Sequence, residues 1–78
     1  MNIKVIAENQ NEENLVLRIK TGIMSYINWM NIRWYKSDLK VDDLDTEYYG
    51  IMVIGDPKYE KKILQIIEEA KNGAYEMM

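Results

Sequence analysis

The most strand-like segment of this chain reads Glu47–Tyr48–Tyr49–Gly50–Ile51–Met52–Val53–Ile54–Gly55. Its apolar residues follow one another without alternation, which is typical of a strand that is buried on both faces. Gly55, Asp56 and Pro57 end this run and indicate the start of a helix, because aspartate is a good N-cap and proline fits the first helical turn. We therefore expect residues 48–54 to form the central strand of a sheet.

Two elements are predicted in the first part of the chain. Asn2–Ala7 alternates well enough to be a strand, with Ile3, Val5 and Ala7 on one face. The segment 15–30 carries apolar residues at spacings of three and four, which predicts a helix. These apolar residues are Leu15, Ile19, Ile23, Tyr26 or Ile27, and Met30.

Gly22 leaves a second interpretation of this helix open. A glycine inside a helix costs about 1 kcal/mol relative to alanine. Residues 15–20 could instead form a strand that ends at Thr21–Gly22. We prefer the long helix, since the acidic pair Glu12–Glu13 would interact favourably with the dipole at its N-terminus.

The next two segments are expected to be a strand and a connection. Asn31–Lys36 has the composition of a second strand, with Trp34 and Tyr35 on opposite faces. Ser37–Thr46 is acidic and is expected to be a long connection.

The clearest helix signal runs from Pro57 to Asn72, between an N-capping Asp56 and a C-terminal Gly73. Residues 74–78 are long enough for a short edge strand. The predicted buried stripe of the helix consists of Tyr59, Ile63, Ile66, Ile67 and Ala70.

The resulting order is βαββαβ, which is the ferredoxin-like pattern. We expect one domain over residues 1–78, with a four-stranded antiparallel sheet and two helices on one face. If residues 15–20 were a strand, the order would be ββαβα. In the ferredoxin-like arrangement the other face of the sheet is bare. It would present Ile6, Tyr48, Met52 and Ile54, with either Trp34 or Tyr35.

The composition argues against several classes of site. The chain has no cysteine and no histidine, so it lacks disulfides, thiolate metal ligands and the usual general base. We therefore expect no catalytic residues, no metal and no cofactor. The formal net charge of −3 argues against direct binding of nucleic acid. Its apolar runs are too short to span a membrane, and a cytoplasmic location is expected.

Carboxylates are densest at Asp42, Asp43 and Asp45. A calcium loop that began at Asp43 would need glycine in its sixth place and glutamate in its twelfth, where this chain has Tyr48 and Ile54. We therefore expect a solvated acidic loop.

The aromatic residues suggest a binding surface. Two Trp, six Tyr and no Phe give every aromatic side chain a polar group, as is common at protein interfaces.

We expect a non-catalytic interaction module that binds another protein or itself as a homodimer. It would act as a regulator, or as an inhibitor that blocks a nucleic-acid-binding target. The expected surface comprises Trp34, Tyr35, Tyr48 and Met52, with Asp42, Asp43 and Asp45 at its rim. The alternative is a regulatory domain that senses a small molecule at a dimer interface.

Overall fold

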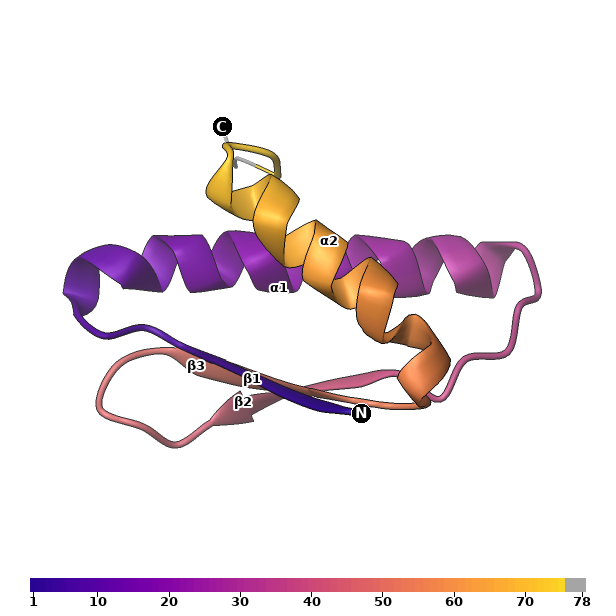
Figure 1. The fold of residues 1–78 in the computed structure, drawn as a ribbon, viewed down its shortest axis with the longest axis horizontal. Helices are drawn as coiled ribbons and strands as arrows, with labels where there is room; N and C mark the ends of the chain where they lie inside the picture. Colours follow the sequence, from indigo (N-terminus) through magenta and orange to yellow (C-terminus); the bar gives the residue numbers. More distant parts are fainter. Residues whose placement is uncertain (76–78) are drawn as a thin grey trace.

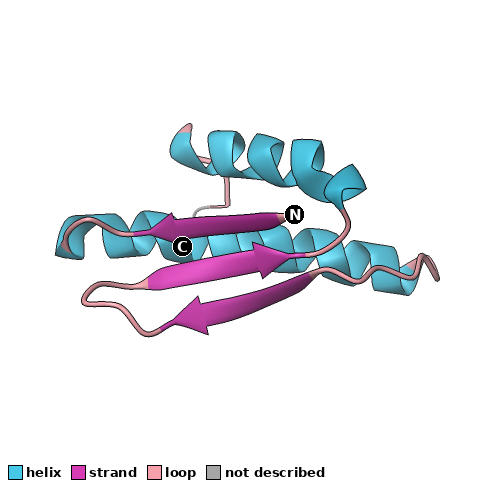
Figure 2. Cartoon of the chain, turned by 60° about the horizontal axis from the view of Figure 1, so that its bottom comes forward, coloured by secondary structure: helices cyan, strands magenta, loops and turns pink. Residues whose placement is uncertain are grey.

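The computed structural model describes residues 1–75 of the chain. Both helices lie on the same side of an antiparallel sheet, as Figures 1 and 2 show from two directions. The elements in chain order are β1 (Asn2–Ile6), η1 (Gln10–Glu12), α1 (Glu13–Ile32), β2 (Lys40–Leu44), β3 (Gly50–Ile54), η2 (Pro57–Tyr59) and α2 (Glu60–Lys71). The two η elements are short 3₁₀ turns that lead directly into the α-helices.

The predicted central strand is confirmed. The strand order is β1-β3-β2, and β3 pairs antiparallel with both neighbours. Ile51 and Val53 of β3 are fully buried, whereas Met52 and Ile54 are only half-buried. The expectation that both faces of this strand are buried is therefore wrong, because the helices cover only one of them.

The long-helix interpretation of residues 15–30 is confirmed, and the strand alternative is wrong. Gly22 is buried where α1 meets α2 and the ring of Tyr75. A β-carbon at this position would lie 2.9 Å from Cγ2 of Ile66, so the glycine permits a close approach between the helices. The core that surrounds this contact consists of Ala7, Val16, Ile19, Ile23, Met30, Leu39, Ile51, Val53, Ile63, Ile66 and Ala70.

The prediction of a second strand at Asn31–Lys36 is wrong, because α1 continues to Ile32 and then closes with a turn. The backbone N–H of Tyr35 donates to the carbonyl of Met30, and that of Trp34 donates to the carbonyl of Asn31. These two bonds form a Schellman motif, in which Trp34 takes the left-handed position with a φ of 63°. Trp34 and Tyr35 therefore belong to the end of a helix and not to the sheet.

The second strand lies instead at β2, inside the stretch that we expected to be an acidic connection. Leu39 is buried just before this strand, while Val41 and Leu44 are half-buried within it. Asp42 and Asp43 are adjacent polar residues, so they interrupt the alternation that would have identified the strand.

The predicted second helix is confirmed, with η2 as its first turn. The carboxylate of Asp56 accepts a hydrogen bond from the N–H of Lys58 at 2.9 Å, and Gly73 has a φ of 97° beyond the end of α2. Of the final strand expected at residues 74–78, Ala74 and Tyr75 form a turn. The remaining positions, 76–78, lie outside the described residues. The structure thus shows an α+β fold with a three-stranded sheet.

Candidate interaction surface

Neither α1 nor α2 covers the face of the sheet that points away from them (Figure 1). Side chains alternate between the two faces of each strand. Since Ile51 and Val53 point to the helices, the strand register assigns three cross-strand rows to the opposite face. We call this surface the open face. Its rows are Ile6–Gly50–Leu44, Lys4–Met52–Asp42 and Asn2–Ile54–Lys40.

The open face is apolar at one end and along its middle. Ile6 remains 45% exposed, and Leu44, Met52 and Ile54 are half-buried. Gly50 lies between Ile6 and Leu44, so the central strand has no side chain in that row. The result is a shallow apolar surface that another protein surface could cover.

Two opposite charges flank the centre of the open face. Lys4 of β1 and Asp42 of β2 lie on either side of Met52 in the same row. Within residues 1–75 neither side chain has a hydrogen bond or an ion pair. Both charges are therefore available to a partner.

Asp43 points to the other side of the sheet. Its carboxylate lies 2.9 Å from Nζ of Lys20 on α1 and accepts a hydrogen bond of 2.9 Å from the hydroxyl of Tyr49. These two bonds lower the pKa of Asp43, and the hydrogen bond to Asp43 raises the pKa of Lys20. Partial burial raises the pKa of Tyr49. Asp43 therefore links α1 to the edge strand β2 through its ion pair with Lys20, and it is not part of the open face.

The other residues of the expected surface are scattered. Trp34 is 91% exposed beyond α1, and the ring of Tyr35 lies 6.0 Å from that of Trp29 on the helix. Asp45 and Tyr48 lie in the loop between β2 and β3, where Tyr48 is half-buried against the core. Of the seven expected residues, only Met52 and Asp42 lie together in one row of the open face.

Sequence reasoning omitted Lys4, Lys40 and Leu44 from this surface. It placed β2 at residues 31–36, and without the correct strand the neighbours of Met52 could not be identified. The sequence did contain a signal for this strand, because the acidic stretch includes three apolar residues, Leu39, Val41 and Leu44. Apolar residues are uncommon in a fully solvated loop, and in the structure these three are buried or half-buried.

The two edges of the sheet are less suited to docking. The edge strand β2 carries Asp42 and Asp43, and the edge strand β1 carries Lys4. Charged residues on edge strands oppose the addition of another strand.

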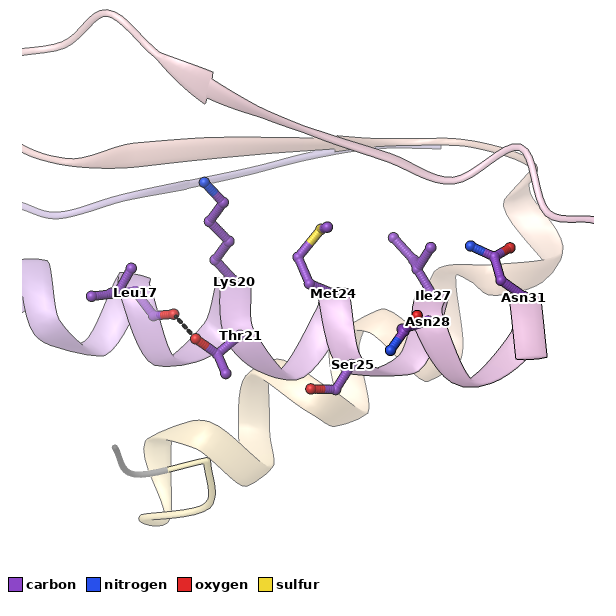
Figure 3. A pocket seen from close by; sticks show the side chains of 8 residues that line it. All are labelled: Leu17, Lys20, Thr21, Met24, Ser25, Ile27, Asn28 and Asn31. Atoms are coloured by element: carbon purple, nitrogen blue, oxygen red, sulfur yellow. Dashed lines mark hydrogen bonds between the residues drawn. The ribbon is translucent and has the colours of Figure 1, made fainter. Parts of the chain in front are cut away.

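A shallow groove runs along α1 beside β2, and Figure 3 shows Lys20, Met24 and Ile27 pointing from the helix toward the strands. The ion pair of Lys20 with Asp43 links the two elements at this groove.

The described part of the chain contains no group of three or more His, Cys, Asp or Glu residues that could hold a metal ion. Its helices include none that is both long enough and apolar enough to cross a lipid bilayer.

Comparison of the chain with protein-family models, with curated proteins and with solved structures gives no match.

Proposed function

We propose that this chain is a non-catalytic protein-interaction module that binds a protein partner on the open face of its sheet. The observation that supports this most strongly is the group of apolar side chains around Met52 on the open face, which no helix covers. The other face of the same sheet is packed against two helices. Exposed apolar patches of this kind mark interaction sites when polar residues surround them. Lys4, Asp42 and Lys40 provide that polar surround.

The charge of the chain indicates how such a module would select its partners. The formal net charge is −3, and Asp42 on the open face lies near the acidic β2–β3 loop with Asp45 and Glu47. Acidic groups at the rim of a surface steer encounters with basic partners and affect the association rate more than the affinity. We infer a regulatory role, in which the open face covers part of its target.

The ferredoxin-like arrangement is part of this proposal. The observed order of three strands and two helices matches the first five elements of that pattern. A fourth strand would pair with the free edge of β1 and would leave the open face uncovered.

Affinity enrichment with paired variants tests the proposal. Met52→Glu places a charge in the middle of the open face, whereas Asn14→Glu adds the same charge to an exposed position at the start of α1. We expect a specific partner of the wild-type chain to be retained by Asn14→Glu and lost by Met52→Glu. Circular dichroism spectra should show that both variants are folded. If folded Met52→Glu retains every partner of the wild-type chain, the open face is not the binding surface.

A second candidate function, the sensing of a small molecule, is supported by a separate observation. An open groove of about 560 Å³ lies between α1 and α2 and is lined by Tyr26, Trp29, Lys62 and Tyr75, among others. The rings of Tyr26 and Trp29 are nearly parallel, with an interplanar angle of 14°. Aromatic rings beside a lysine suit a planar anionic ligand. A panel of aromatic acids, read by thermal shift, should raise the Tm of the wild-type chain but not that of Trp29→Ala.

A further inference from the structure

We propose that the occupant of the open face is a second copy of this chain, related by a two-fold axis that runs parallel to β3 between two facing sheets. This inference rests on the proposed function, because it names the partner of the same surface. Its basis is the pair of opposite charges in the central row of the open face, which is complementary to itself under one rotation and not under the alternative.

The rotation about an axis parallel to β3 preserves each row and exchanges the two outer strands. Met52 then faces Met52 of the second copy, and Lys4 of each chain faces Asp42 of the other. In the next row Ile6 faces Leu44. The third row brings Ile54 opposite Ile54 of the second copy and places Lys40 opposite the polar Asn2. Apolar residues thus meet apolar residues, and each charge in the central row meets its opposite.

The rotation about an axis perpendicular to the strands gives the opposite result. If it passes through Met52, it keeps each strand above its own copy, so Lys4 faces Lys4 and Asp42 faces Asp42. Like charges that are brought together at an interface are destabilising. The same rotation also places the apolar Ile6 above the polar Asn2. The parallel axis is therefore the arrangement that this face favours.

The proposed packing agrees with known sheet geometry. Facing sheets pack about 10 Å apart, with mean strand directions within about 30° of each other. A lysine and an aspartate on opposing sheets can reach each other across that distance. A two-fold dimer uses the same patch on both copies, so each such contact occurs twice. The dimer would have its helices on the two outer sides, away from the interface.

Charge reversal with rescue tests this arrangement. In Lys4→Asp or Asp42→Lys, both central contacts of the dimer become repulsive. We expect the dissociation constant of the dimer to rise by a factor on the order of ten or more. The double variant Lys4→Asp/Asp42→Lys restores both contacts, so its dissociation constant should return to near that of the wild type. Sedimentation equilibrium at low ionic strength measures all four proteins. A wild-type chain that is monomeric at about 0.5 mM, or a double variant no tighter than the single ones, would overturn the proposed dimer.

Cross-linking gives an independent test that requires no charge change. The chain contains no cysteine, so Met52→Cys introduces a single thiol next to the two-fold axis. A bis-maleimide that spans about 10 Å should link two copies of Met52→Cys efficiently and should not link Gln65→Cys, which lies on the exposed side of α2. Equal cross-linking of the two variants would contradict the dimer. If the wild type is monomeric but Met52→Glu still loses a different protein, only the self-association is wrong and the proposed function stands.

Discussion

Gly22 of α1 lies directly against the ring of Tyr75: a β-carbon at position 22 would be 2.8 Å from Cε2 of that ring. The hydroxyl of Tyr75 donates a hydrogen bond of 2.9 Å to Glu69, which fixes the ring against α2. This contact brings the two helices together on one side of the sheet. It therefore contributes to the arrangement that leaves the open face uncovered.

Gly22→Ala should destabilise the fold although alanine is the better helix former. The added methyl group would also lie 2.9 Å from Cγ2 of Ile66, which is buried and cannot move aside freely. Overpacking of this kind costs roughly 1–3 kcal/mol, against a gain in helix propensity of about 1 kcal/mol. We expect the free energy of unfolding in urea to fall by about 1 kcal/mol. Ser25→Ala, at an exposed position one turn later, is the matched control and should be neutral or slightly stabilising.

Trp34→Gly should stabilise the chain. Both α-helices end in the same hydrogen-bonding motif, but the left-handed position is occupied by Gly73 after α2 and by Trp34 after α1. A side chain in that conformation costs about 1 kcal/mol or more, which glycine avoids. The Tm of Trp34→Gly should therefore rise by several degrees. Trp34→Ala retains the strain, so an equal rise in that variant would show that the backbone explanation is wrong.

The Lys20–Asp43–Tyr49 cluster should make stability depend on pH at both extremes. Folding lowers the pKa of Asp43 below its ordinary 3.8, so its contribution is present at neutral pH and is lost as the pH falls through the lowered pKa. Folding raises the pKa of Lys20 and of Tyr49 above 10.5 and 10.0, so their contributions are present below those values and are lost as the pH rises through the raised pKa values.

Denaturation of the wild type and of Asp43→Asn across this pH range measures the effect. The wild type should be the more stable protein at pH 7, and the two curves should converge as the pH falls through the lowered pKa of Asp43. The effect should be small, because the side chain of Asp43 is 59% exposed. Asp45→Asn, which removes the same charge from the exposed loop, is the matched control for the change in net charge. A constant difference between wild type and Asp43→Asn at every pH would contradict the assigned ion pair.

Sequence patterns predicted the elements that carry strong local signals. The periodicity of α1 and α2, the Asp56 cap and the glycine at position 73 all agree with the structure. The second strand was misplaced because Trp34 and Tyr35 have strand-like composition, whereas Asp42 and Asp43 do not. Hydrogen bonds explain both cases. The Schellman bonds hold residues 34–35 at the end of a helix. Lys20 and Tyr49 each donate a hydrogen bond to Asp43, which allows an aspartate within β2 to face the helices. Such contacts cannot be inferred from local propensity.

The candidate surface was predictable only where it depends on β3 and β1. Successive side chains of a strand point to opposite faces of the sheet. This rule alone assigned Met52, Ile54 and Ile6 correctly to the face without helices. Leu44 and the charge pair Lys4–Asp42 depend on the register of three strands. That register required knowledge of where β2 begins and of which residues it pairs with.

Methyl NMR spectra, recorded as the concentration of the chain is raised, test the central claim most directly. If two copies of the chain associate through the open face, the methyl signals of Ile6, Met52 and Ile54 should shift together with concentration. Those of Met24 and Ile32, which are exposed on α1, should stay constant. Concentration-dependent shifts at Met24 or Ile32, with none at Met52, would contradict the account.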